Sequence, residues 1–187
     1  VNRIKDYYKE KGFLDAEVKI NEQKDTTLQN SVILIIAVNK KKKVKINSIS
    51  FEGNKALSDR QLKSTMKDTK EKHFYRLFSS SKFLDENFQQ DKAKIIAKYN
   101  AKGYRDAKIE RDSVYRHDKK TLNINIKIFE GHKYYFRNIT WVGNTKYPTE
   151  ELNNILGIKK GDIFDQATLD ARLYMSQTGR DISTLYL

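Results

Sequence analysis

The stretch from Val44 to Asn54, VKINSISFEGN, occurs again in this chain as YYFRNITWVGN, from Tyr134 to Asn144. The two stretches align without a gap at a distance of 90 positions. Both carry large apolar residues at the same four places, which in the first copy are Val44, Ile46, Ile49 and Phe51. The apolar alternation changes phase in the middle of each copy. This shift predicts a β-bulge, or a connector that runs into a strand, at one equivalent point of both copies.

Two further pairs of segments repeat at nearly the same distance. Residues 8–18, YKEKGFLDAEV, match residues 99–109, YNAKGYRDAKI, 91 positions later. At a distance of 90, the apolar residues Val32, Leu34, Ile36 and Val38 match Leu122, Ile124, Ile126 and Ile128. A period of roughly 90 residues exceeds that of the usual solenoid repeats, so each unit is predicted to be a small domain with its own core. The chain is expected to hold the C-terminal part of one unit (1–43), one complete unit (44–131) and the N-terminal part of a third (132–187).

The complete unit is predicted to begin with a strand and a helix. The strand ends at Gly53-Asn54, two residues that tolerate left-handed backbone geometry. Ser58 and Gln61 have the spacing of a capping box, which predicts a first helix whose Leu62 faces inward. A polar connection, 68–84, follows this helix.

The second half of the unit is predicted to be a helix and a hairpin. The helix should run from about Asp85 to Lys102 and end at Gly103, where glycine avoids the steric cost of a left-handed residue. Residues 104–116 and 122–128 then form two strands, and the clean alternation of the second predicts one buried and one wet face. The predicted fold class is α+β, with tandem β-α-α-β-β modules that each hold a three-stranded mixed sheet covered by two helices.

This order of elements, and its repetition, resembles the POTRA domains of the Omp85 family. The resemblance rests on Phe-Glu-Gly-Asn at 51–54, Lys-Gly-Tyr at 102–104 and Phe-Glu-Gly at 129–131, which leads directly into the next opening strand. It implies non-catalytic periplasmic modules that precede a membrane barrel. It also implies binding of unfolded outer-membrane β-barrel proteins and of accessory lipoproteins, partly by adding a partner strand to a sheet edge. An outer-membrane assembly factor and a two-partner secretion or translocation-and-assembly transporter both remain open.

The resemblance places the peptide-binding edge on the strand after the second helix. The residues concerned are Lys108, Ile109, Glu110, Arg111, Asp112, Ser113 and Val114. Their charges are typical of an edge protected against uncontrolled pairing, and equally of an exposed strand whose pairing is regulated. A second candidate is an aromatic cluster between the helices, Phe74, Tyr75, Leu77 and Phe78. This cluster is either an exposed docking patch or a set of side chains that tucks under the helices or a neighbouring module.

Composition limits the other functions. The chain has no cysteine, which excludes disulfides, zinc–thiolate sites and cysteine nucleophiles. Its three histidines lie far apart and no phosphate loop or nucleophile elbow is present, so no metal, cofactor or enzymatic activity is predicted. The net charge of +13 fits either a lysine-rich surface or an attraction for nucleic acid or an anionic membrane. The run Lys40–Lys43 could likewise contact lipid headgroups or an acidic partner, or be a solvated linker.

A basic nucleic-acid-binding βααβ module is the alternative from a different class. A KH module needs a Gly-x-x-Gly loop between its helices, and the stretch 68–84 contains no glycine, so no nucleic-acid partner is predicted. No apolar run approaches the ~20 residues of a membrane-spanning helix. The expected location is the periplasmic face of the outer membrane, with the signal peptide and the anchoring C-terminal barrel outside this sequence.

Overall fold

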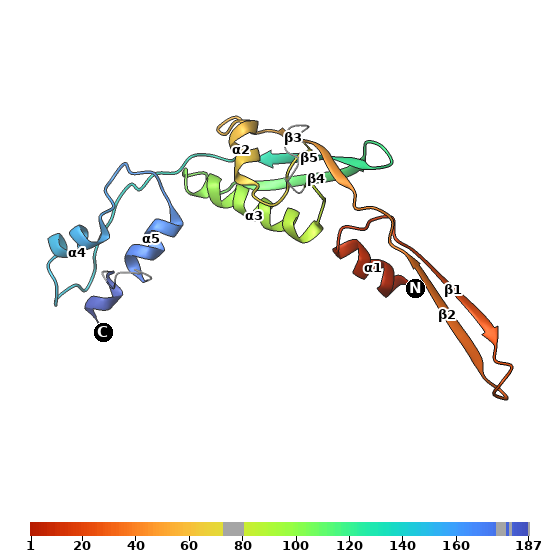
Figure 1. Cartoon of the computed structure of the whole chain (residues 1–187). Helices are drawn as coiled ribbons and strands as arrows, with labels where there is room; N and C mark the ends of the chain where they lie inside the picture. The colour runs from red at the N-terminus through yellow and green to blue at the C-terminus, as the bar shows by residue number, and fades with distance from the viewer. Residues whose placement is uncertain (73–80, 175–178, 180, 187) are drawn as a thin grey trace.

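The chain is extended, with its secondary structure distributed along an arc (Figure 1). This architecture comes from a computed structural model that describes residues 1–72, 81–174, 179 and 181–186. A helix and a long hairpin lie at the N-terminal end, a sheet with helices lies in the centre, and short helices lie at the C-terminal end. None of the helices in the described ranges is both long and apolar enough to span a bilayer.

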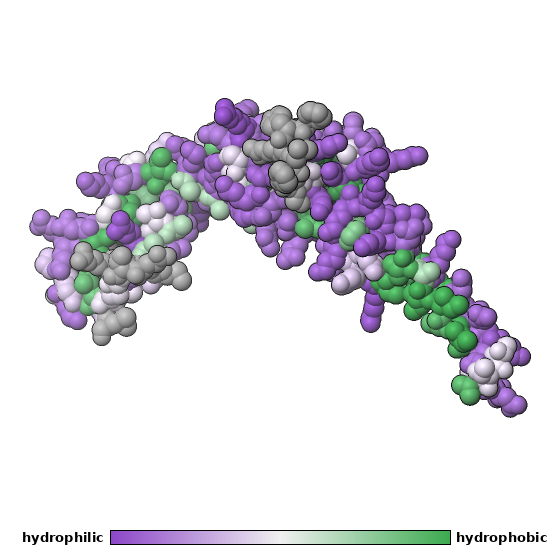
Figure 2. All heavy atoms as spheres, viewed as in Figure 1, coloured by the Kyte–Doolittle hydropathy of each residue, from purple (hydrophilic) through white to green (hydrophobic). Residues whose placement is uncertain are grey.

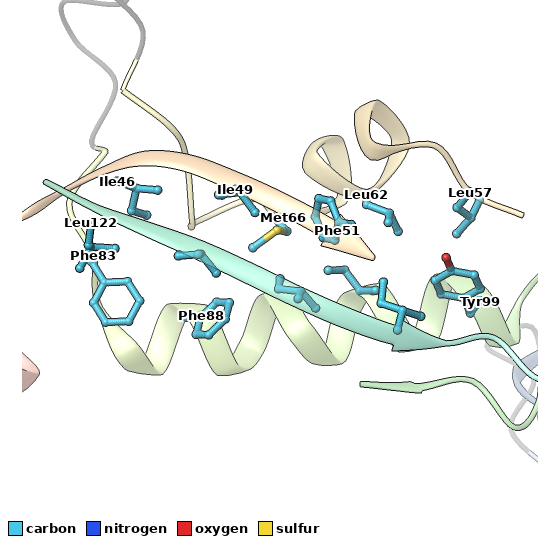
Figure 3. Close-up of a cluster of buried hydrophobic side chains, with 14 of the residues drawn as sticks. Ile46, Ile49, Phe51, Leu57, Leu62, Met66, Phe83, Phe88, Tyr99 and Leu122 are labelled. Atoms are coloured by element: carbon cyan, nitrogen blue, oxygen red, sulfur yellow. The ribbon is translucent and has the colours of Figure 1, made fainter. Parts of the chain in front are cut away.

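The central sheet has three strands, β3 (Lys45–Glu52), β4 (Lys108–Arg116) and β5 (Thr121–Phe129), in the order β3-β5-β4. Strand β5 runs parallel to β3 and antiparallel to β4. Helices α2 (Asp59–Thr65) and α3 (Asp85–Asn100) pack against this sheet through the buried side chains drawn in Figure 3. The predicted α+β fold with a three-stranded mixed sheet is confirmed.

The bulge predicted in the opening strand is present. The pairing of β3 with β5 shifts register between Ile46 and Ser48, which leaves Asn47 as the extra residue. Ile46 and Ile49 are three positions apart and would face opposite sides of a regular strand. The bulge returns both side chains to the buried face, where Ile46 is fully covered and Ile49 nearly so.

The two predicted helix starts are confirmed, whereas the end of the second helix was predicted two residues too late. Ser58 Oγ accepts a hydrogen bond from the Gln61 backbone N–H, and Gln61 Oε1 accepts one from the Ser58 backbone N–H at 3.0 Å, which completes the capping box. Helix α3 starts at Asp85 as predicted and ends at Asn100, shortly before Gly103, whose φ is +90°.

The start of the next strand was predicted four residues too early. Residues 104–107 do not extend the sheet, because the Tyr104 N–H still donates to the Tyr99 carbonyl and the Ala107 N–H donates to the Tyr104 carbonyl. These two hydrogen bonds form a turn that brings the chain round the end of α3. Strand β4 therefore begins at Lys108.

One contiguous core lies between this sheet and its helices (Figure 3). All of its buried members fall between positions 44 and 128. They are Val44, Ile46, Ile49, Phe51, Leu57, Leu62, Met66, Phe83, Phe88, Ile95, Tyr99, Ala107, Leu122, Ile124, Ile126 and Ile128. This set contains the helix residues and the alternating β5 residues that the apolar periodicity predicted to face inward.

A buried carboxylate, Asp91 on α3, holds the chain that leaves α2. Its two oxygens accept hydrogen bonds from the backbone N–H groups of Lys67, Asp68 and Thr69 at 2.6–3.0 Å. Burial alone would raise the Asp91 pKa, but the Lys94 ammonium at 2.9 Å and the backbone donors outweigh burial and lower that pKa. Asp91 therefore stays ionised and satisfies backbone N–H groups of the connection that follows α2.

The Phe-Glu-Gly end of β5 is tied to the start of the module. Glu130 Oε1 accepts hydrogen bonds from the Tyr99 hydroxyl and from the Ala56 backbone N–H, both at 2.8 Å. Gly53, with φ at +83°, lies so close that an added Cβ would sit 2.2 Å from the Ile128 carbonyl oxygen. The glycine of Phe-Glu-Gly-Asn is thus required by a close approach of two backbones.

The flanking repeats have fewer elements. The N-terminal one contains α1 (Asn2–Glu10) and an antiparallel hairpin of β1 (Glu17–Lys24) and β2 (Val32–Asn39). The C-terminal one contains α4 (Thr149–Leu156), α5 (Gln166–Leu173) and the short 3-10 helix η1 (Ser183–Leu185). Its copy of the opening strand forms only an isolated bridge, between Tyr135 and Ile163.

Candidate partner-binding edge

The central sheet has two edges, and the β3 edge is covered. The connection between α2 and α3 runs along it on both sides of residues 73–80. The Ile46 N–H donates to the Ser81 carbonyl and the Ile46 carbonyl accepts from the Lys72 N–H, both at 2.8 Å. Further along the strand, the Ile49 N–H donates to Glu71 Oε1 at 2.7 Å. The outward backbone groups in this part of β3 therefore already have partners.

The β4 edge is open. Within the described residues, the backbone of β4 forms hydrogen bonds to β5 alone, so the groups on its other side have no protein partner. All seven residues predicted to form the binding edge, 108–114, lie on this strand. The β4–β5 register shifts between Ile109 and Arg111, so Glu110 occupies a bulge. A bulge near the end of an edge strand limits the length over which another strand can pair.

The two acidic side chains of β4 are paired with lysines inside the fold. Asp112 lies 2.9 Å from the Lys92 ammonium on α3, and Glu110 lies 2.9 Å from the Lys127 ammonium on β5. The hydrogen bond and charge of Lys127 lower the pKa of Glu110. The Glu110–Lys127 pair is exposed and contributes little to stability. Both pairs neutralise charges that would otherwise repel or misdirect an incoming strand.

Apolar side chains are also available along this strand. Ile109 packs partly against the core, whereas Val114 and Tyr115 remain 39% and 52% exposed. A strand that pairs here would meet free backbone groups together with these side chains. The arrangement satisfies both requirements of strand addition, since main-chain hydrogen bonds give affinity and side chains give preference.

The second predicted site is the aromatic cluster between the helices. Phe74, Tyr75, Leu77 and Phe78 lie within residues 73–80, outside the described residues, so the aromatic docking cluster stays a prediction. Over the ranges that are described, no three His, Asp or Glu side chains lie close enough together to hold a metal ion.

The contact between successive repeats was not predicted. The Gly103 carbonyl accepts a hydrogen bond from the Tyr134 N–H at 2.9 Å, and an added Cβ on Gly103 would lie 2.7 Å from Ile163 Cγ2. Gly12, its copy in the preceding repeat, would bring a Cβ within 2.9 Å of Leu84 Cδ2 and 3.0 Å of the Phe83 carbonyl oxygen.

Both glycine turns contact the same backbone bridge in the repeat that follows, where the opening segment is hydrogen-bonded to the segment before the second helix. The Phe83 N–H donates to the Val44 carbonyl, and the Phe164 N–H donates to the Tyr134 carbonyl, each at 3.0 Å. The repeated Lys-Gly-aromatic motif was the available signal. It was interpreted only as a helix end, although it also forms the junction between repeats.

The geometry defines a class of protein, a chain of repeated small α+β units whose central sheet has one closed edge and one free edge. The sequence profile of the POTRA family, described as surface antigen variable number repeat, matches residues 44–131 and 134–177. The chain belongs to this family, as its resemblance predicted.

Relatives and a solved structure agree with this assignment. The chain is 30% identical over 172 residues to the outer membrane protein assembly factor BamA of Neisseria meningitidis serogroup B. This match covers 91% of the present chain and 21% of that protein. It is 28% identical over 173 residues to a putative outer membrane protein assembly factor of Treponema pallidum. That match covers 89% of the present chain and 20% of the relative. The chain thus spans about a fifth of the length of these relatives.

The fold is also similar to a crystal structure of Haemophilus influenzae BamA POTRA3-5. The TM-score is 0.50 at 20% sequence identity, and the match covers 90% of this chain and 63% of that one.

Proposed function

We propose that this chain is a non-catalytic periplasmic scaffold of an outer-membrane protein assembly factor, and that β4 accepts a strand from an unfolded outer-membrane β-barrel protein. The observation that carries the proposal is the asymmetry of the central sheet. The β3 edge is occupied by the connection that contains Lys72 and Ser81, whereas the β4 edge is free. The relatives named as outer-membrane assembly factors support the wider role.

Strand addition at β4 needs no particular partner sequence. Outward N–H and C=O groups recur at every second residue of an edge strand, so any extended chain can pair with them. The bulge at Glu110 separates the start of β4 from the stretch Arg111–Arg116. We expect the partner to pair along this stretch, with contacts to Val114 and Tyr115.

The proposal includes the arrangement of the whole chain. Residues 1–43 are the C-terminal part of one module, 44–131 a complete module and 132–187 the N-terminal part of a third. Accessory lipoproteins of the assembly complex bind along the same array, and a C-terminal barrel attaches it to the outer membrane. Nucleic acid is not a partner in this account.

Amide hydrogen exchange by NMR tests strand addition. The probe is a synthetic peptide with the sequence of the last strand of an outer-membrane β-barrel protein. Addition at the edge should slow exchange at alternate amides of Arg111–Arg116, because only every second N–H points outward. The Ile46 and Ile49 amides of β3 serve as the internal control and should be unchanged, since both already have partners.

Two results would contradict the proposal. The first is protection of every amide along β4, which indicates general stabilisation. The second is peptide binding without any change in β4, which places the site elsewhere. A scrambled peptide with proline at alternate positions is the matched control, because it cannot donate the ladder hydrogen bonds.

A further inference from the structure

A basic cavity lies where the first repeat meets the second. Its volume is about 410 Å³, and its walls include Lys41–Lys43, Lys45, Lys72, Lys119 and Lys120. These lysines come from three separate parts of the sequence. They are the linker into β3, the connection after α2 and the turn between β4 and β5. The fold, and not one local run of sequence, therefore gathers this charge.

Backbone hydrogen bonds fix the positions of the lysines on the second repeat. The Lys45 N–H donates to the Lys120 carbonyl at 3.0 Å, and the Lys72 N–H donates to the Ile46 carbonyl at 2.8 Å. Asp118 Oδ1 accepts from the Lys120 N–H at 2.6 Å, which holds the turn. The side chains of Lys45, Lys72 and Lys120 thus start from anchored points around the cavity.

The positive charge of this cavity is largely uncompensated. Lys41 pairs with Glu17 at 3.1 Å, but across the described ranges Lys42, Lys45, Lys72, Lys119 and Lys120 form no ion pair. The one carboxylate in the wall, Asp15, is paired with Arg116. Ammonium groups that share a cavity repel one another, and a multivalent anion between them would remove that repulsion.

The repeat itself does not produce this charge. At the second junction, the positions that match Lys41 and Lys42 are Gly131 and His132, and Tyr135 matches Lys45. Both junctions share the same glycine turn and the same bridge. Lys43 has a lysine copy, Lys133, so the charge that is specific to the first junction is that of Lys41, Lys42 and Lys45.

We infer that this cavity binds a compact anion that carries phosphate. Lysine ammonium groups bind phosphate as point charges and need no planar geometry. The volume lies within the ~300–1,000 Å³ typical of small-molecule sites, and walls on several sides suit a compact group better than an extended polymer. A soluble phosphate compound and the headgroup of an anionic phospholipid share this chemistry.

Calorimetric titration of the 187-residue chain with inorganic pyrophosphate tests the inference. The variant K45Q/K72Q/K120Q removes three cavity ammonium groups, and K19Q/K55Q/K102Q removes three exposed ones elsewhere. We expect the cavity variant to bind about tenfold or more weakly and the control less than about twofold, since remote charges are screened at ~0.1 M salt. Circular dichroism of both variants should match the parent chain, because all six substituted side chains are exposed.

Vesicle flotation separates the two sources of phosphate. If phosphatidylcholine vesicles bind only when they contain phosphatidylglycerol, and pyrophosphate or the cavity variant abolishes binding, the ligand is a headgroup. If pyrophosphate binds but the vesicles do not, the ligand is soluble. Either result supports the site. The site would be overturned if both triple variants lost binding equally, or if the parent chain did not bind pyrophosphate. It would also be overturned if an oligonucleotide or an acidic peptide bound in the cavity and pyrophosphate did not displace it.

Discussion

Two hairpins whose second strands share four apolar positions behave differently in this chain. In the β4–β5 hairpin, Ile124 and Ile126 are completely buried, whereas their copies in the β1–β2 hairpin, Leu34 and Ile36, are 52% and 48% exposed. The hairpin β1–β2 accordingly shows an apolar surface along its length (Figure 2). The shared apolar positions alone do not create burial. Strand β5 has β3 beside it and α2 and α3 against it, whereas β1 is the only strand beside β2 among the described residues.

The largest expected difference is in the cost of a core truncation. Ile126→Ala should lower the free energy of unfolding by about 2–5 kcal/mol, since it removes a fully buried side chain and leaves a cavity. Ile36→Ala, at the matching position of β2, should change it by less than about 0.5 kcal/mol. Urea unfolding followed by circular dichroism measures both. Equal effects would show that the β1–β2 hairpin is covered in solution.

The glycines of the two Gly-Asn turns provide a second matched pair. Gly53→Ala should cost about 3 kcal/mol, because its Cβ would lie 2.2 Å from the Ile128 carbonyl oxygen at a φ of +83°. Gly143 has a φ of +77° and no atom within 4 Å of an added Cβ, so Gly143→Ala should show only the conformational cost of ~1 kcal/mol. Thermal unfolding of the two variants gives the comparison. A smaller cost at Gly53 than at Gly143 would contradict the close approach of the Gly53 turn to β5.

The buried carboxylate that holds the chain after α2 should make the central unit sensitive to acid. Asp91→Asn should destabilise the chain by about 2 kcal/mol at neutral pH, because three backbone donors lose a charged acceptor. The folded-state pKa of Asp91 is lowered, so its contribution is complete above the unfolded carboxyl pKa, about 3.9, and is lost as pH falls through the folded value.

The pH dependence of urea unfolding checks this assignment. Stability of the parent chain should fall below about pH 4, and the Asp91→Asn variant should show a weaker fall. Asp85→Asn, at an exposed position on the same helix, is the control and should keep the parent profile. A variant that retains the full acid sensitivity would assign that sensitivity to other carboxylates.

The smallest expected effect is at the second junction. The Tyr134 hydroxyl donates to Asp106 Oδ2 at 2.6 Å, and this bond raises the pKa of Tyr134. Val44 stands at the matching place of the first junction and has no hydroxyl. Tyr134→Phe should therefore lower the thermal unfolding midpoint only slightly, because the hydrogen bond that it removes is exposed. No change would show that the backbone bond to Gly103 and the packing of Ile163 hold this junction without the hydroxyl.

Much of the central unit could be predicted because its signals are local. The capping box at Ser58, the phase change near Asn47 and the alternation after Thr121 each correspond to an observed cap, bulge or strand. The start of β4 was misplaced because Tyr104 is aromatic, and aromatic residues favour strands. Its backbone N–H instead completes a turn with Tyr99.

Features that join distant segments could not be read in the same way. The connection that closes the β3 edge is polar and has no periodicity, so nothing in its sequence indicates that Lys72 and Ser81 bond to Ile46. Asp91 lies three positions after Phe88 and four before Ile95, so the helical period places it on the buried face of α3, but nothing in the sequence indicates which backbone groups it bonds. The basic cavity combines Lys72 and Lys120 with the linker run, and that proximity exists only after the chain has folded.

Site-specific photo-crosslinking to an unfolded outer-membrane β-barrel protein tests the central claim most directly. The photoreactive residue is placed at Tyr115 on the open β4 edge or at Ser50 on the covered β3 edge, both exposed. A free edge on one side of the sheet alone predicts adducts from position 115 and almost none from position 50. Equal yields at both positions, or adducts from position 50 only, would contradict it.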